Sequence, residues 1–359
     1  MKRIMMIAPH YEEYAFLLSR AISDHAEVLL VLRQDLLDRD FAGRLRPVAP
    51  NVTIRHNSFR TVAEFGRLLA DLRRFRPDVL HWQEPSGFIK AVMAAAMVAW
   101  ARRFTRTALT IHDVVPHSGD DARVAARFAG IRRHVRACVD RLFVHGPTCR
   151  KQYLHDYLPM PHADERVRLT DHGMILAGDA QCEPGDGFRA LMFGRMEAYK
   201  GLDVLLRAIT DLAGRGCMID LEMAGSGPEL DRLENGFRAM PHVRVDNRFV
   251  SSAVLIEKIR AADCVLLPYL DATQSGVLAA AFANGRFVIA SRVGGLSDLV
   301  EHGVNGLLVP PGDADALAEA LRIVAGDPAL RRRLRAGARR AAEDRLDWGP
   351  IAARMIDDY

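Results

Sequence analysis

Apolar and polar positions along this chain follow two alternating patterns. Short, largely apolar runs such as Arg3–Ala8, Asp78–Trp82 and Ala108–His112 are typical of buried strands. Between them lie longer stretches such as Val62–Phe75, where apolar residues recur every three or four positions, as in an amphipathic helix. Strands that alternate with helices predict a parallel, doubly wound sheet. The other elements predicted in the first half are strands at Glu27–Leu32 and Arg141–Val144, helices at Tyr14–Ser23 and Ile89–Phe104, and a helix after Pro147.

A second series of alternating elements begins at Phe188, after the stretch from Leu169 to Gly187, which is rich in glycine and aspartate and has no periodicity. We therefore predict two domains, 1–175 and 176–345, and a terminal helical segment, 346–359. The predicted strands of this series are Phe188–Phe193, Met218–Met223, Val243–Val245, Val265–Pro268 and Phe287–Ala290. The predicted helices are Gly201–Ala213, Pro228–Ala239, Ser252–Ala261, Ala314–Ala325 with Asp313 as N-cap, and Pro350–Asp358.

Length and composition agree with two soluble domains. The chain has 359 residues, of which 49% are hydrophobic and 26% charged. Its five scattered cysteines form no CxxC pair, so we expect a reducing cytoplasm and no structural zinc. No signal peptide is visible, and the most apolar segment, Ala91–Ala101, is too short to cross a bilayer and is expected to be a buried helix.

The positive charge is concentrated in the first half. Residues 1–175 carry a net charge of +8, whereas the remainder carries −4. Much of this excess lies in Ala122–Arg136, whose pattern predicts a basic amphipathic helix. Such a helix could contact anionic lipid or an anionic acceptor, and a solvated helix face explains it equally well. No aromatic-rich basic motif accompanies the charge, so nucleic acid is not the expected partner.

Three turns in the second half suggest a phosphate site. In the first, Arg195 and Lys200 bracket a loop that follows a strand and enters a helix. Because a cation at a helix N-terminus opposes the macrodipole, Lys200 favours an anionic ligand. The second is Ala224–Pro228, with Gly225 and Gly227, and the third is Thr273–Gly276, at the start of a helix. All three are expected at the carboxyl end of one sheet.

These residues together resemble the glycosyltransferases of GT-B fold, and most closely the retaining glycosyltransferase family 4. The resemblance rests on FGRMEAYKGLDVLLRAI, EMAGSGPELDRLE, ADCVLLPY, GVLAAAFANGRFVIASRVGGLSDLVEHGVNGLLVPPGD and the terminal DWGPIAARMIDDY, and more loosely on RPDVLHWQEP and ALTIHDVVPH. It implies two Rossmann-like domains that face each other across a cleft. The first would bind the acceptor and the second the nucleotide-sugar, and the last helix would cross back onto the first domain.

The resemblance also implies roles for individual residues. Arg195 and Lys200 would bind the diphosphate, and His112 would contact the donor sugar. The donor site would further include Gly225, Gly227, Arg248, Phe249, Asp271, Thr273, Gln274, Ser275 and Gly276, with the base held at Arg248-Phe249. The acceptor candidates are Glu12, Glu13, Tyr14, His81, Glu84, Asp113 and His117.

The chain departs from the family pattern at two positions that usually carry glutamate. Alanine stands there, at Ala272 and Ala280, where the glutamates usually touch the sugar hydroxyls and the ribose. Asp271, one residue earlier, is a candidate replacement for the first of these glutamates. The pattern ATQSGV resembles a bacterial subgroup that acts in polysaccharide assembly, so we do not take these departures as loss of activity.

We therefore expect a cytoplasmic, metal-independent enzyme that moves a hexose from a nucleotide diphosphate sugar to a hydroxyl of a sugar or lipid-linked acceptor, with retention. Asp38-Arg39-Asp40 has the DxD form, but it lies in a helix-like stretch and is interpreted as a solvated face. Contact with the inner face of an anionic membrane, through the basic first half, stays open. Two alternatives are a GT-B nucleotide-sugar epimerase and a non-catalytic binding protein. A dehydrogenase is not favoured, because no GxGxxG follows the first strand.

Overall fold

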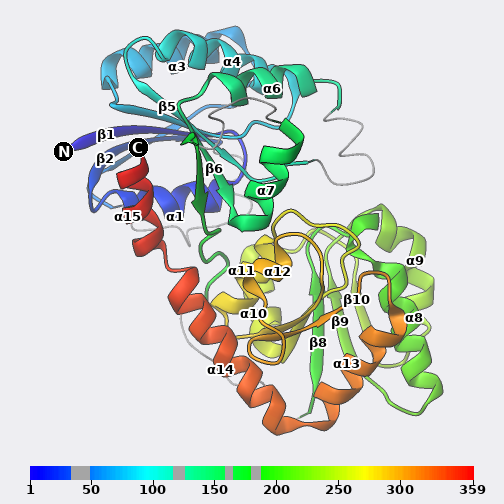
Figure 1. Ribbon diagram of the computed structural model, residues 1–359. Helices are drawn as coiled ribbons and strands as arrows, with labels where there is room; N and C mark the ends of the chain where they lie inside the picture. The colour runs from blue at the N-terminus through cyan, green and yellow to red at the C-terminus, as the bar shows by residue number, and fades with distance from the viewer. Residues whose placement is uncertain (34–48, 116–125, 158–164, 179–186) are drawn as a thin grey trace. The chain divides into compact units, whose positions relative to one another are not determined.

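The computed structural model describes residues 1–33, 49–115, 126–157, 165–178 and 187–359. It divides into two compact units (Figure 1). Unit 1 contains the described residues up to Gly173 together with Asp347–Tyr359, and unit 2 is Met174–Leu346.

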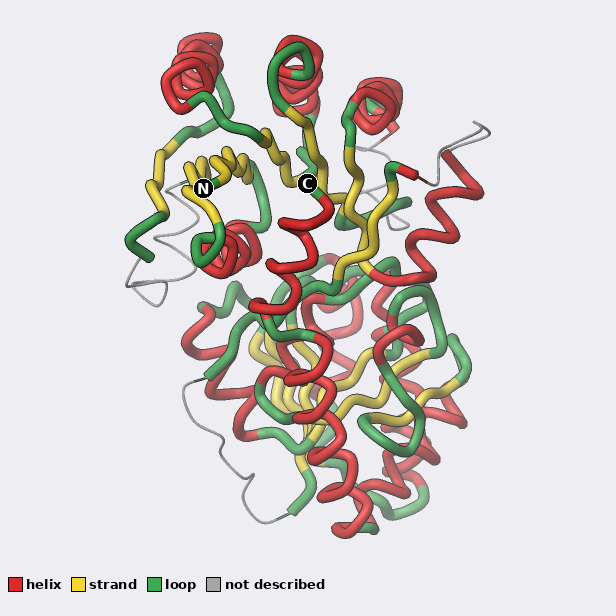
Figure 2. Tube along the Cα trace, turned by 60° about the vertical axis from the view of Figure 1, so that its left-hand side comes forward, coloured by secondary structure: helices red, strands yellow, loops and turns green. Residues whose placement is uncertain are grey.

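Unit 1 is built on a seven-stranded, wholly parallel sheet, with strand order β3-β2-β1-β4-β5-β6-β7. The strands are β1 (Lys2–Ala8), β2 (Ala26–Leu32), β3 (Val52–His56), β4 (Val79–Gln83), β5 (Arg106–Ile111), β6 (Arg141–His145) and β7 (Val167–Thr170). The helices are α1 (Glu12–Ile22), α3 (Val62–Phe75), α4 (Phe88–Ala101), α6 (Ala129–Cys138), α7 (Gly146–Tyr157) and α15 (Trp348–Asp358). Helices α3, α4 and α6 cover one face of the sheet, and α1 and α15 pack together on the other (Figures 1 and 2).

Unit 2 contains a six-stranded parallel sheet, with strand order β10-β9-β8-β11-β12-β13. The strands are β8 (Arg189–Phe193), β9 (Asp220–Ala224), β10 (Val243–Asp246), β11 (Cys264–Leu267), β12 (Phe287–Ser291) and β13 (Gly306–Val309). The helices are the short 3₁₀ helix η2 (Ala198–Lys200), α8 (Leu202–Gly214), α9 (Pro228–Arg238), α10 (Ser252–Ala261), α11 (Gly276–Ala283), α12 (Leu296–Leu299), α13 (Ala314–Gly326) and α14 (Pro328–Arg345).

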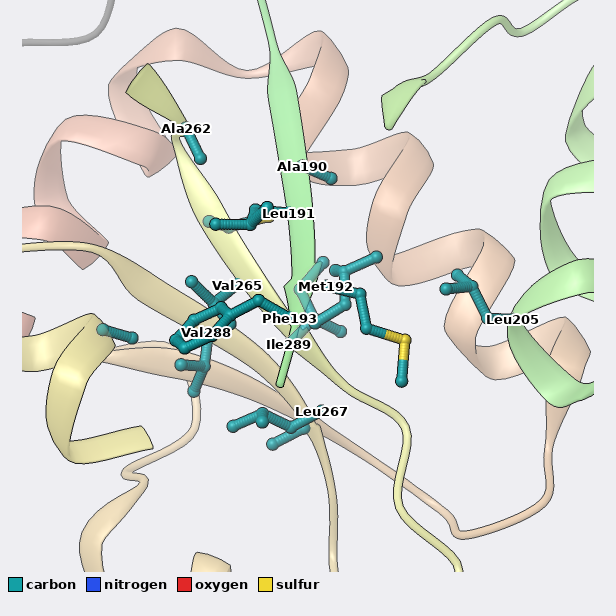
Figure 3. Close-up of a cluster of buried hydrophobic side chains, with 14 of the residues drawn as sticks. Ala190, Leu191, Met192, Phe193, Leu205, Ala262, Val265, Leu267, Val288 and Ile289 are labelled. Atoms are coloured by element: carbon teal, nitrogen blue, oxygen red, sulfur yellow. The ribbon is translucent and has the colours of Figure 1, made fainter. Parts of the chain in front are cut away.

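The core of unit 2 lies between this sheet and its helices. Figure 3 shows side chains of β8, β11 and β12, including Leu191, Val265 and Ile289, packed against one another. Because both faces of a parallel sheet are covered, its strands are apolar along their whole length. This explains why the runs at Cys264–Leu267 and Phe287–Ser291 could be identified from the sequence.

The predicted alternation of strands and helices is confirmed, with some local differences. The helix predicted at Ile89–Phe104 ends at Ala101, and Phe104 is exposed. Strands β3 and β7 and the eighteen-residue helix α14 were not predicted from the sequence. Asp313 does cap α13, since its side chain accepts a hydrogen bond from the Ala316 N–H. No helix within the described ranges is long and apolar enough to span a membrane.

Candidate functional site

The loop after β8 carries the two cations that the sequence singled out. It leaves the sheet at Phe193, passes through Gly194 and Arg195, and ends in η2 at Lys200. The Arg195 side chain is exposed, whereas Lys200 is only 4% exposed. A Cβ built on Gly194 would lie 3.1 Å from Lys200 Nζ and 3.6 Å from Val277 Cγ2. The Lys200 amine and the N-terminus of α11 therefore flank the same glycine.

The loop after β9 packs directly against the loop after β8. The N–H of Gly194 donates to Ala224 O at 3.0 Å, and the N–H of Met196 donates to Ser226 O at 3.0 Å. Gly225 has a φ of +143°, and a Cβ there would lie 2.0 Å from Gly194 O. Only glycine permits this approach, so the predicted meeting of these two turns at the carboxyl end of the sheet is confirmed.

The third turn joins this group through β11 and α11. The N–H of Leu270 donates to Tyr199 O at 2.7 Å, which ties the loop after β11 to η2. Ser275 caps α11, with its hydroxyl accepting from the Leu278 N–H at 3.2 Å. The first N–H groups of a helix have no intrahelical acceptor and attract anions. The α11 N-terminus, with Gly276 and preceded by Thr273, thus lies beside Gly194.

The electrostatics of Lys200 favour an anionic ligand. Its Nζ lies 3.5 Å from Phe193 O and 5.3 Å from the centroid of the Tyr269 ring. Burial, reinforced by the nearby Arg195, lowers the pKa of Lys200 from 10.5 to about 7, against a smaller opposing effect of Glu197. No ion pair between Lys200 and a carboxylate occurs in the described part of the chain. A phosphate would supply the missing countercharge.

The two positions at which the chain departs from the expected family pattern are buried. Ala272 is 4% exposed and Ala280 is fully buried, and both belong to the core of unit 2. Asp271, the predicted substitute, is exposed. Gln274 lies in the same turn, and its Oε1 is buried without a hydrogen-bond partner among the described atoms. An unsatisfied buried acceptor costs about 1–3 kcal/mol, so Gln274 is suited to accept a hydrogen bond from a ligand.

The predicted base-binding residues follow β10. The Nε of Arg248 donates to Asp246 Oδ1 at 2.6 Å, which directs the guanidinium toward that strand end. Phe249 is 55% exposed. An exposed aromatic ring at the carboxyl end of the sheet offers a stacking surface, in addition to the backbone contacts that the sequence suggested.

In unit 1, His112 lies at the carboxyl end of β5, in a buried aromatic cluster. Its Nε2 lies 2.8 Å from Gln83 Oε1, and its ring stacks on Tyr11 with 3.7 Å between centroids. Because an amide oxygen can only accept, Nε2 carries the proton and Nδ1 is an acceptor. Nδ1 is buried without a partner among the described atoms. Burial, with the nearby His145 as the next cause, holds the pKa of His112 well below its usual value.

His145 and His172 complete this cluster and were missed by the sequence analysis. The centroids of His112 and His145 are 5.0 Å apart, and those of His145 and His172 are 5.3 Å apart. His145 ends β6 and His172 follows β7, so both lie at the same edge of the sheet as His112. A sequence signal existed for His145 alone, which directly follows the predicted strand Arg141–Val144. Tyr11 has a left-handed φ of 61°, which costs about 1–2 kcal/mol for a residue with a side chain. That conformation accompanies its stacking on the His112 ring.

Four of the predicted acceptor residues lie at this edge of unit 1. Glu12 and Glu13 begin α1 and are largely buried. Tyr14 contacts His112 edge-to-face at 4.8 Å, and Asp113 Oδ2 accepts a hydrogen bond from Tyr11 at 3.4 Å. The fifth, His117, and the Asp38–Asp40 motif lie outside the described residues.

The two remaining acceptor candidates, His81 and Glu84, make structural contacts. His81 is fully buried and bonds Thr110 Oγ1 at 2.8 Å and the Tyr359 hydroxyl. Glu84 accepts two hydrogen bonds from Arg136, at 2.7 and 2.8 Å.

Arg132 makes a third hydrogen bond to Glu84, at 2.9 Å. Arg136 is 1% exposed, so the interpretation of the basic helix as a solvated face, one of the two left open by the sequence, does not hold for this residue. The physical reason is that Glu84, which precedes Arg136 by 52 residues in the sequence, supplies a buried countercharge. Among the described residues, no group of three or more His, Cys, Asp or Glu could hold a metal ion.

Comparison with known proteins agrees with this architecture. The family described as "Glycosyl transferases group 1" matches residues 187–327. The chain is 30% identical over 350 residues to "D-inositol 3-phosphate glycosyltransferase" of Saccharomonospora viridis. The aligned region covers 87% of this chain and 80% of that protein. Its fold is similar to sucrose-phosphate synthase of Thermosynechococcus elongatus, with a TM-score of 0.77 at 20% identity over 99% of this chain and 98% of that one.

A second structural relative is HepE of Anabaena in complex with UDP-glucose. Its TM-score is 0.72 at 16% identity, over 99% of both chains. At such identities the solved structures inform on the fold alone, whereas the sequence relative and the family match inform on the family. The chain therefore belongs to the group 1 glycosyltransferases and has the GT-B fold.

Proposed function

We propose that this glycosyltransferase takes a hexose from a nucleoside diphosphate sugar and that Arg195 and Lys200 bind the diphosphate. The buried Lys200 amine carries this proposal, because it lies beside a second cation and makes no ion pair with a carboxylate in the described structure. The relative HepE, described in complex with UDP-glucose, supports the same donor class.

We propose that the chemical step depends on charge stabilisation by these groups and needs no metal ion. When the bond to the sugar breaks, negative charge develops on the leaving diphosphate. In this proposal Arg195, Lys200 and the first N–H groups of α11 stabilise that charge, and the position of the Lys200 amine and of α11 beside Gly194 supports it. Transfer with retention is part of the proposal. The acceptor hydroxyl attacks the anomeric carbon on the same face as the leaving group, the bond from that carbon to the diphosphate breaks, and the hydroxyl proton passes to the leaving diphosphate.

The sugar and the ribose of the donor cannot be bound by the two glutamates of the expected family pattern, because this chain lacks them. Ala272 and Ala280 are buried and cannot accept hydrogen bonds through their side chains. We propose that the Gln274 amide oxygen accepts from a donor hydroxyl. Phe249 and Arg248 contact the base, Gly225 and Gly227 allow the loop to approach the nucleotide, and Asp271 lies next to the same turn.

For the acceptor we propose a hydroxyl of a sugar, cyclitol or lipid-linked sugar. The relative of Saccharomonospora viridis is named for inositol 3-phosphate, so a phosphorylated cyclitol is the first acceptor to test. His112 is our candidate for the donor sugar, through its Nδ1, which has no hydrogen-bond partner in the described part of the chain. Glu12, Tyr14 and Asp113 lie at the same edge of the sheet and are our candidates for the acceptor.

The donor can be identified by thermal shift with a panel of nucleoside diphosphates and nucleotide-sugars, since a ligand that binds the native state raises the melting temperature. Transfer from the donor found is then measured with Arg195→Ala and Lys200→Ala. We expect both variants to lose at least about a hundredfold in kcat/KM, the order of magnitude for removing one charge-stabilising group. Undiminished transfer in both variants would refute these roles.

Arg207→Ala is the matched control. Arg207 is an exposed arginine of α8 in the same unit, with Asp203 4.0 Å away, and its removal should leave transfer unchanged. The anomeric configuration of the product, read by NMR, tests retention. Flotation with vesicles tests whether the protein contacts an anionic membrane, as a location at the inner face of the membrane requires.

A further inference from the structure

Unit 1 contains a cavity of about 1110 Å³ at the edge of its sheet away from His112. The cavity is lined by residues from 72–78, 100–106 and 140–141. These segments connect α3 to β4, α4 to β5 and α6 to β6, so they lie at the amino ends of the three strands. His112 follows β5 at its carboxyl end. The proposed transferase site therefore does not account for this cavity.

The lining of the cavity is strongly basic. Six arginines and two aspartates contribute to it. Two of the arginines are occupied: Arg106 bonds Tyr359 O, and Arg141 Nε donates to Asp358 O at 2.9 Å. The other four are exposed, and none forms an ion pair with a carboxylate in the described structure; they are Arg73, Arg76, Arg102 and Arg103.

The two aspartates do not neutralise these arginines. Asp78 Oδ2 accepts from the backbone N–H of Arg3 at 2.7 Å. Asp140 Oδ2 accepts from both the N–H and the hydroxyl of Thr107, at 2.8 and 2.9 Å. Both carboxylates thus support the starts of neighbouring strands, and the cavity keeps an excess of positive charge.

An ordinary explanation for these arginines is the negative end of a helix dipole. Helices α3, α4 and α6 all end at this edge, and each terminus is equivalent to about half a negative charge. Three such termini do not balance the excess of four arginines over aspartates in the lining. Aromatic rings also line the cavity: the Arg73 guanidinium lies 4.9 Å from the Trp100 ring centroid, and Trp100 contacts Phe104 edge-to-face at 4.8 Å.

We infer that this cavity, which we call the arginine cavity, binds a phosphate-bearing anion. A guanidinium group can donate two parallel hydrogen bonds to one phosphate. Several guanidinium groups around one concave surface therefore suit a ligand with more than one negative charge. The site is separate from the proposed donor site, since it lies in the other unit and uses none of its residues. The phosphate could belong to a soluble metabolite or to a phospholipid headgroup, and both sources present the same chemistry.

The test uses the full chain with inorganic pyrophosphate as the soluble probe and hydrogen–deuterium exchange as the readout. Exchange separates the arginine cavity from the donor site, because protection of 72–78 and 100–106 is read independently of protection of 193–201. Phosphatidylcholine vesicles containing phosphatidylglycerol form the second arm. The test variant is Arg102→Gln with Arg103→Gln, and the matched control is Arg332→Gln with Arg333→Gln, two adjacent exposed arginines of α14.

We expect a probe to protect 72–78 and 100–106, and the test variant to weaken that binding at least about tenfold while the control does not. Protection by pyrophosphate identifies a soluble ligand, and protection by anionic vesicles alone identifies a lipid headgroup. The inference is overturned if neither probe protects these segments. It is equally overturned if the Arg102→Gln/Arg103→Gln variant binds as well as the wild-type protein.

Discussion

Replacing Lys200 by methionine should stabilise the ligand-free protein and abolish nucleotide binding. Methionine approximates the length and apolar stem of lysine but carries no charge. Lys200 is 4% exposed, and burial together with Arg195 lowers its pKa to about 7. The buried charge of Lys200 therefore lowers the stability of the ligand-free protein, and a bound anion would offset this unfavourable free energy.

The magnitude follows from the lowered pKa. An unfolded lysine titrates near 10.5, and each pKa unit corresponds to about 1.36 kcal/mol, so the protonated Lys200 is disfavoured by about 5 kcal/mol. Replacing lysine by methionine removes this cost, and imperfect packing of the methionine side chain offsets part of the resulting gain in stability. We expect Lys200→Met to raise the free energy of unfolding at pH 7 by at least about 1 kcal/mol.

The pH dependence has a definite sign. Below pH 7, Lys200 is protonated in both the folded and the unfolded chain, and the full cost of the buried charge is present. Between pH 7 and 10.5 the unfolded chain binds more protons, so this cost is relieved as the pH rises. The advantage of Lys200→Met should therefore be greatest at or below pH 7 and vanish near pH 10.5.

The assay is thermal unfolding with and without the nucleoside diphosphate found by screening. The wild-type melting temperature should rise with ligand, whereas that of Lys200→Met should start higher and stay constant. Binding to the wild-type protein should also take up protons above pH 7, which calorimetry in buffers of different ionisation enthalpy measures.

Lys258→Met is the control, because Lys258 lies in the same unit but pairs with Glu222 and with Asp246 at 3.5 Å. Its replacement removes a countercharge, so the protein should be destabilised and still bind nucleotide. A lowered melting temperature of Lys200→Met, as expected for Lys258→Met, or a retained ligand-induced shift would contradict the role given to Lys200.

Three further predictions concern other parts of the molecule. Gln274→Ala should raise KM for the donor sugar about fivefold or more, by removing an acceptor worth about 1 kcal/mol in donor binding, without lowering the melting temperature of the free protein; a normal KM contradicts the proposed hydrogen bond. Gly225→Ala places a Cβ 2.0 Å from Gly194 O, so calorimetry should show weakened nucleotide binding and a lower melting temperature, and an unchanged protein contradicts the described loop contact. Acid should destabilise unit 1 between pH 6.5 and about 4. Burial keeps several histidines of the folded unit neutral, while the same histidines take up protons in the unfolded chain. Hydrogen exchange measures the stability of the unit, and constant stability over this pH range would contradict the burial of these histidines. The histidines whose pKa values are lowered to about 3 or 4 are His10, His81, His145 and His172.

Elements with strong local signals could be predicted from the sequence. Helix Val62–Phe75 was predicted with its observed ends from its amphipathic pattern. The structure adds a capping box at its start, formed by Thr61 and Glu64. Strand β3 was missed because Val52–His56 lies at the edge of its sheet with partly exposed side chains, so it lacks the apolar run of a central strand. Helix α14 was missed because it is rich in arginine and buries only a narrow stripe that includes Leu330 and Leu334, so its apolar periodicity is weak.

Contacts between distant residues could not be predicted from the sequence. Glu84 was expected to face an acceptor, yet it pairs with Arg132 and Arg136, which follow it by 48 and 52 residues. The sequence marked His112 but not its neighbours His145 and His172. They meet it because successive parallel strands end at the same edge of the sheet.

The sequence by itself determined the alternation of elements, the family and the three turns around Arg195 and Lys200, because each depends on local patterns of residues. The tertiary structure decided what surrounds those residues. It buried Lys200 with no carboxylate partner among the described residues, paired Glu84 inside unit 1 and gathered Arg73, Arg76, Arg102 and Arg103 around one cavity. Charge and burial act through space, so their balance at a site depends on groups that the linear order of the chain does not bring together.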